Sequence, residues 1–153
     1  MQALSSRSAP EGLHARILVA AGQVAASAFV VLGILGLLRT GLGHLTDTEG
    51  ERLVFLELNG LTSIVHLVAG LVGAAMTASL AGARRYALAV GVLGTPFALL
   101  GYVLDATGSD IFGRNATLTT IHLVVALAAL VLALWPSRPR HPASSRDGTA
   151  EAA

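Results

Sequence analysis

The sequence predicts an all-α polytopic membrane protein, a bundle of four transmembrane helices made of two parallel helical-hairpin repeats. The first observation is composition: 54% of the 153 residues are hydrophobic and 12% are charged, whereas soluble domains carry about 25% charged residues. The second is a set of four apolar segments, each close to the roughly 20 residues that cross about 30 Å of hydrocarbon. The third is a likeness between the second and fourth segments at an offset of 56 residues, from position 66 to position 122.

The first apolar segment, 17–38, contains only two polar side chains, Gln23 and Ser27, which a helix in a membrane bundle tolerates. Its residues 26–28 resemble a signal-peptide cleavage site, but the apolar run continues past them and exceeds the 7 to 15 residues of a signal core. We therefore expect a retained transmembrane helix. The second segment, 58–80, is similarly apolar.

The third segment, 86–104, contains Pro96. Proline removes one backbone hydrogen bond, so we expect a kink there, which membrane helices tolerate. The fourth segment, 116–135, ends at Pro136 and places Trp135 at the membrane interface, where its amphipathic ring is favoured.

Together these segments predict a transmembrane domain over 17–135, flanked by a cytoplasmic tail over 1–16 and a disordered cytoplasmic tail over 136–153. The second tail is rich in Pro, Ser, Arg and Ala and has almost no large apolar residues. Residues 81–85 are expected to form a tight turn between helices two and three. The outer loop, 39–57, is expected to contain an amphipathic turn around 53–56.

The arginine distribution predicts the orientation, because short loops rich in Lys and Arg stay in the cytoplasm. With the N-terminus inside, seven of the ten cationic residues are cytoplasmic: Arg7, Arg16, Arg84, Arg85, Arg138, Arg140 and Arg146. We therefore predict a multi-pass protein of the inner (cell) membrane with both termini cytoplasmic.

The internal repeat is clearest around two histidines. In both copies an Asn precedes the His by seven residues, and Leu-Val follows the His. The likeness continues along one helical face with the spacing of a heptad. We call its six polar members the polar seam: Asn59, Ser63 and His66 in one copy, and Asn115, Thr119 and His122 in the other.

An even number of crossings separates the two copies, so both helices run in the same direction and the halves form a parallel repeat. Each Asn is placed to cap its helix N-terminus. Each His lies about 10 Å deeper and is expected to face the bundle interior, since lipid is a poor environment for imidazole.

Three interpretations of the polar seam remain open. In the first, small residues let helices two and four approach closely while the polar side chains bond between them. In the second, His66 and His122 are axial ligands of a haem, with Gly70 and Ala126 leaving room for the macrocycle. In the third, the histidines form part of a proton relay or permeation path, because imidazole titrates near neutral pH.

The two motifs, Asn-x6-His-Leu-Val-x-Gly from Asn59 and Asn-x6-His-Leu from Asn115, resemble an uncharacterised bacterial membrane family, common in actinobacteria, catalogued as domain of unknown function 4383. The resemblance covers about residues 17–135 and implies a four-helix fold in a membrane without an assigned activity. Members carry His-Asn three or four residues before the helix-two His, where this chain has Thr62 and Ser63. This departure argues against a haem or metal site that needs a second histidine on helix two.

Composition also limits the possible functions. The chain has no Cys, which excludes disulfides, zinc–thiolate sites and iron–sulfur clusters. A net charge of +1 does not favour a nucleic-acid partner. No nucleotide-binding loop, serine triad or carboxylate pair is present, so we predict no enzymatic activity and no metal.

The preferred hypothesis is a non-enzymatic membrane scaffold or partner-binding subunit, with lipid and a membrane protein or a second copy as partners. The alternatives are a haem-binding electron-transfer module and a small proton-coupled transporter or channel.

Overall fold

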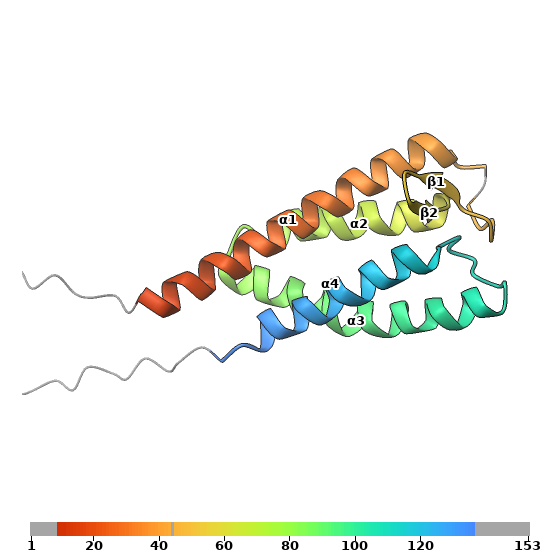
Figure 1. The fold of residues 1–153 in the computed structure, drawn as a ribbon. Coiled ribbons are helices and arrows are strands. Elements are labelled where there is room, and N and C mark those ends of the chain that lie inside the picture. Colours follow the sequence, from red (N-terminus) through yellow and green to blue (C-terminus); the bar gives the residue numbers. More distant parts are fainter. Residues whose placement is uncertain (1–8, 44, 137–153) are drawn as a thin grey trace, which may run out of the picture.

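The computed structural model describes residues 9–43 and 45–136; most of the predicted C-terminal tail and the first eight residues lie outside this part. The elements are helix α1 (Ala9–Thr40), strands β1 (Glu51–Leu53) and β2 (Leu56–Leu58), and helices α2 (Gly60–Met76), α3 (Leu80–Ala106) and α4 (Ala116–Leu134) (Figure 1). The predicted all-α architecture of four helices is therefore confirmed, with one small β-hairpin added between α1 and α2.

Three of the helices have the length and composition of membrane spans: α1 over Gly12–Thr40, α3 and α4. Helix α2 is equally apolar in character but has 17 residues, which gives a length of about 25 Å. The surface of the described bundle is covered with exposed Leu, Val and Ile side chains, as expected where the surrounding solvent is hydrocarbon.

The helices are arranged in two pairs, α1 with α2 and α3 with α4. Both described chain ends lie at one end of the bundle, which we call the terminal end, and the β-hairpin lies at the opposite end, which we call the hairpin end (Figure 1). One buried apolar cluster joins α1, α3 and α4 and contains Leu18, Ala83, Ala87 and Ala133. Another, at the hairpin end, contains Leu56, Leu58 and Leu118.

Close approach within the pairs depends on glycine. A Cβ built on Gly33 of α1 would lie 2.5 Å from the backbone nitrogen of Leu67, and one built on Gly70 of α2 would lie 2.5 Å from that of Val30. The expectation that small residues such as Gly70 bring helices two and four together is therefore wrong. Gly70 faces α1, and α2 and α4 do not pack along their length.

The connections also differ from expectation. The turn between α2 and α3 lies at 77–79, and residues 81–85 are already helical, because the Ser79 side chain caps α3 by accepting from the backbone N–H of Gly82. The predicted amphipathic turn around 53–56 is instead the β1–β2 turn, with Glu51 paired to Leu58 and Leu53 to Leu56. A strand pair satisfies backbone groups between its strands, and a short helical turn leaves most of them free.

Candidate functional site

The polar seam begins with two asparagines that each cap a helix and reach across to another segment. The Oδ1 atoms of Asn59 and Asn115 accept from the backbone N–H groups of Thr62 (3.0 Å) and Leu118 (2.9 Å). The Nδ2 group of Asn59, a residue that is 1% exposed, donates to the carbonyl oxygens of Asp47 (2.9 Å) and Ile111 (2.7 Å). Both caps follow the prediction made from the sequence.

Each asparagine also donates a hydrogen bond to a backbone carbonyl in the other half of the chain. Asn59 donates to the carbonyl oxygen of Ile111, and Asn115 donates to that of Phe55 (3.0 Å). Residues 59 and 115 are 56 positions apart, and so are residues 55 and 111. Each contact is therefore the counterpart of the other at the repeat offset.

The two histidines meet where the helix pairs face each other. The Nε2 atoms of His66 and His122 lie 2.9 Å apart, and the ring centroids are separated by 5.0 Å. Phe29 of α1 packs edge-on against His66 at 63° and 5.5 Å, and Phe97 of α3 packs edge-on against His122 at 64° and 5.9 Å. The result is a row of four rings, with each histidine supported by a phenylalanine of its own helix pair.

The hydrogen bonds determine which ring nitrogens carry protons. His66 Nδ1 lies 2.7 Å from the carbonyl oxygen of Thr62, which can only accept, so His66 Nδ1 donates. In a neutral ring the Nε2 atom of His66 is then an acceptor, and His122 Nε2 must donate the single proton between the rings. His122 Nδ1 is left as an acceptor; it is buried and has no partner in the described structure.

The other seam residues are buried on the same two helices. Ser63 is fully buried and its hydroxyl donates to the carbonyl oxygen of Asn59 (2.7 Å). Thr119 is also fully buried, but its hydroxyl has no hydrogen-bond partner in the described structure. The seam thus carries two unsatisfied polar atoms, Thr119 Oγ1 and His122 Nδ1, both on α4.

The histidine geometry does not fit a haem between the two rings. A metal–imidazole bond is about 2 Å long, so an ion held between two Nε2 atoms separates them by about 4 Å. The observed separation is 2.9 Å, which suits one shared proton, and the flanking rings of Phe29 and Phe97 occupy the positions beside the pair.

The model of one protein family, a domain of unknown function (DUF4383), matches residues 19–135. The chain belongs to this family. No curated protein and no solved structure matches it. Membership of DUF4383 confirms the resemblance predicted from the sequence, and the family is one of unknown function.

Thr62 of this DUF4383 chain has specific contacts at the helix pair junction. Its hydroxyl donates to the carbonyl oxygen of Phe112, in the loop before α4, and its own carbonyl accepts from His66. Thr62 and Ser63 thus use their polar groups within the DUF4383 fold, at the positions where the resemblance implies a histidine and an asparagine.

Sequence reasoning missed two buried charges, Asp110 and Arg114, which lie between the third and fourth apolar segments of this DUF4383 chain. The side chains of Arg114 and Asp110 are 0% and 4% exposed and form an ion pair of 3.0 Å. The Arg114 guanidinium lies 4.1 Å from the ring centre of Phe97 and 4.9 Å from that of Phe112, and it donates to the Phe97 carbonyl oxygen (3.2 Å). Through Phe97 this ion pair is connected to His122.

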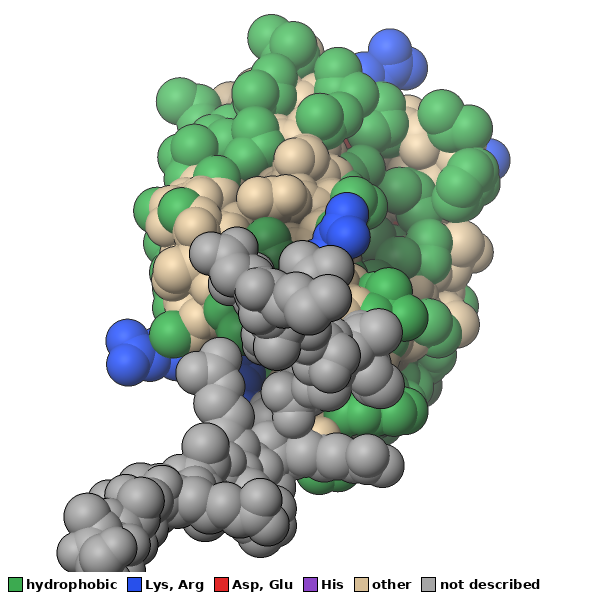
Figure 2. All heavy atoms as spheres, turned by 90° about the vertical axis from the view of Figure 1, so that its left-hand side faces the viewer, with side chains coloured by type: hydrophobic (Ala, Val, Ile, Leu, Met, Phe, Trp, Pro, Cys, Tyr) green, Lys and Arg blue, Asp and Glu red, His purple; other side chains and the backbone are tan. Residues whose placement is uncertain are grey.

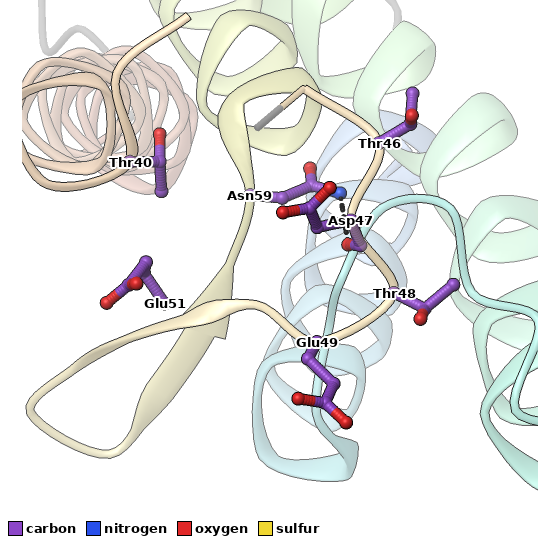
Figure 3. A pocket seen from close by; sticks show the side chains of 7 residues that line it. All are labelled: Thr40, Thr46, Asp47, Thr48, Glu49, Glu51 and Asn59. Atoms are coloured by element: carbon purple, nitrogen blue, oxygen red, sulfur yellow. Dashed lines mark hydrogen bonds between the residues drawn. The ribbon is translucent and has the colours of Figure 1, made fainter. Parts of the chain in front are cut away.

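A polar cavity of about 630 Å³ lies at the hairpin end, beside the seam (Figure 3). It is lined by Thr40, Thr46, Asp47, Thr48, Glu49, Glu51 and Asn59. Figure 3 shows the carboxylates of Glu49 and Glu51 pointing away from each other. Within the part of the chain that the structure describes, no group of three His, Cys, Asp or Glu side chains is arranged to hold a metal ion.

Proposed function

We propose that this DUF4383 chain is a multi-pass protein of the cell membrane with four spans and both termini in the cytoplasm. In this proposal two parallel hairpin repeats, α1–α2 and α3–α4, are joined by the polar seam. The protein acts as a non-enzymatic scaffold or partner-binding subunit, whose outward faces contact lipid and a membrane partner.

The observation that carries the scaffold proposal is that most polar groups of the seam form hydrogen bonds within the chain itself. Asn59, Asn115, Ser63 and His66 all bond to backbone groups, and His66 and His122 bond to each other. In an apolar medium such groups stabilise a structure when they are paired within it. A seam whose polar groups are mostly bonded within the chain, with Thr119 Oγ1 and His122 Nδ1 as the buried exceptions in the described structure, suits a junction between two helix pairs better than a site that turns over a substrate.

The repeat is supported by contacts that recur at the 56-residue offset. The hydrogen bond from Asn59 to Ile111 corresponds to the one from Asn115 to Phe55, because both donors and both acceptors are related by 56 residues. The His66–His122 contact joins two residues that are themselves related by this offset. Two similar halves related by an axis along the membrane normal would produce such a pattern. The arginines at the terminal end favour a cytoplasmic location of that end of the bundle.

The transporter alternative has less support from the same geometry. A proton path needs a continuous chain of donors and acceptors, whereas the hydrogen bonds from His122 through His66 end at the carbonyl oxygen of Thr62. The haem alternative conflicts with the short distance between the two Nε2 atoms.

The scaffold proposal predicts that the protein purifies as an assembly. In mild detergent, light scattering combined with size-exclusion chromatography should give a protein mass well above the 15.6 kDa of one chain, as a homo-oligomer or with a second protein in fixed stoichiometry. The detergent contribution is subtracted from refractive index and absorbance. A strictly monomeric protein with no stoichiometric partner in several mild detergents would contradict the scaffold role.

A further inference from the structure

A shallow groove of about 390 Å³ lies at the terminal end of the bundle, between α1 and the start of α3. It is lined by Ala15, Arg16, Val19, Ala20, Gln23 and Leu80. Four of these side chains are apolar. The other two, Arg16 and Gln23, are exposed and lie on one face of α1, seven residues or about 10 Å apart along the helix.

Neither polar side chain of the groove is used within the described structure. Arg16 forms no ion pair there, and Gln23 forms no hydrogen bond there. Their guanidinium and amide N–H groups are therefore free to donate. A guanidinium suits an oxyanion such as phosphate, because its donors match two oxygens at once.

The groove lies at the level where the helices end. Gly22, next to Gln23, approaches Thr77 in the turn that follows α2, at 2.8 Å from a built Cβ. Leu18, between Arg16 and Val19, packs against Ala133, one residue before the end of α4. A groove at the ends of membrane helices faces the boundary between headgroups and hydrocarbon.

From Gly12 onward, the charged side chains described at the terminal end are arginines. Arg84 and Arg85, in the first turns of α3, are exposed near the same end of the bundle as Arg16. Figure 2 views the molecule from this end and shows arginine side chains standing out from a largely hydrophobic surface. Anionic lipids are attracted to such a surface by about 1 kcal/mol for each arginine near it.

We propose that this groove binds one anionic phospholipid. The phosphate contacts the Arg16 guanidinium, the Gln23 amide donates to a phosphate or ester oxygen, and an acyl chain lies along Val19, Ala20 and Leu80. The site goes beyond the scaffold role and rests only on the proposed location in a bilayer. It gives the terminal end a selectivity for lipid charge that the apolar outer surface of the helices lacks.

Native mass spectrometry of protein released from micelles with equal amounts of phosphatidylglycerol and phosphatidylcholine tests the site. The wild-type protein should retain phosphatidylglycerol at least fivefold better than phosphatidylcholine, since about fivefold corresponds to the attraction of one arginine. Arg16→Ala should lower this preference about fivefold, Arg16→Lys should lower it less, and Gln23→Leu should weaken it. Arg39→Ala is the matched control, since Arg39 is an exposed arginine at the other end of the same helix.

An equal preference in wild type and Arg16→Ala would overturn the proposal, and so would an equal loss in Arg39→Ala, which would indicate a general effect of net charge. Competition by inorganic phosphate at millimolar concentration would overturn it as well, because the site would then recognise a free anion. These outcomes are independent of the mass measurement. An oligomeric protein without lipid preference contradicts the groove alone, and a monomeric protein with lipid preference contradicts the scaffold role alone.

Discussion

Replacement of Arg114 by methionine will lower the free energy of unfolding by about 3–5 kcal/mol, the range for removing one partner of a buried ion pair. The substitution leaves the Asp110 carboxylate buried and unpaired. It also removes the hydrogen bond to the Phe97 carbonyl and the contacts with the rings of Phe97 and Phe112. Unfolding in mixed detergent micelles, followed by circular dichroism, measures the loss.

The matched control is the exposed ion pair between Arg52 and Glu57 in the β-hairpin, whose arginine side chain is 72% exposed. Arg52→Met should cost less than about 1 kcal/mol. The double variant Asp110→Asn with Arg114→Met should be more stable than Arg114→Met alone, because no unpaired charge remains. Equal losses in Arg114→Met and Arg52→Met would contradict the structural role assigned to the buried pair.

Gly33→Leu will separate α1 from α2 and destabilise the protein by about 1–3 kcal/mol or more, the usual cost of overpacking. A Cβ added at this position would lie 2.5 Å from the Leu67 backbone nitrogen and 2.7 Å from the Leu67 Cα atom. Backbone atoms cannot move aside as the end of a flexible side chain can, so the helices themselves must shift. The same unfolding measurement records the effect.

Gly12 provides the control on the same helix, since a Cβ built there meets no atom within 4 Å. Gly12→Ala should leave stability unchanged or raise it by up to about 1 kcal/mol, because alanine is the better helix former. If Gly33→Leu changed the free energy of unfolding as little as Gly12→Ala, the result would contradict the close approach of α1 and α2 at Gly33.

Much of the fold follows from local sequence. Apolar runs of about 20 residues predict helices because a chain in lipid must satisfy its backbone within each segment. The caps at Asn59 and Asn115 follow from the position of an amide side chain just before an apolar run. The repeat offset predicted that His66 and His122 both face the interior, and in the structure their Nε2 atoms lie 2.9 Å apart.

Other features depend on contacts that a single sequence does not contain. A heptad of small residues indicates a close helix partner but does not identify it, and Gly70 faces α1. Arg114 and Asp110 stand in a connecting segment, where charges are usually solvated. The rings of Phe97 and Phe112 cover the Arg114 guanidinium, and Phe97 comes from α3, outside the connecting segment. An Asp and an Arg four residues apart, Asp110 and Arg114, were the only local signal of this pair.

A double-mutant cycle on His66 and His122 tests the central claim most directly, because that claim is that the polar seam joins the two helix pairs. The cycle compares the unfolding free energies of wild type, His66→Ala, His122→Ala and the double variant. We predict a coupling energy of about 0.6–1.7 kcal/mol, the range for hydrogen bonds between membrane helices, with the second substitution costing less than the first. Strictly additive losses would mean that the two imidazoles do not interact and would contradict the junction.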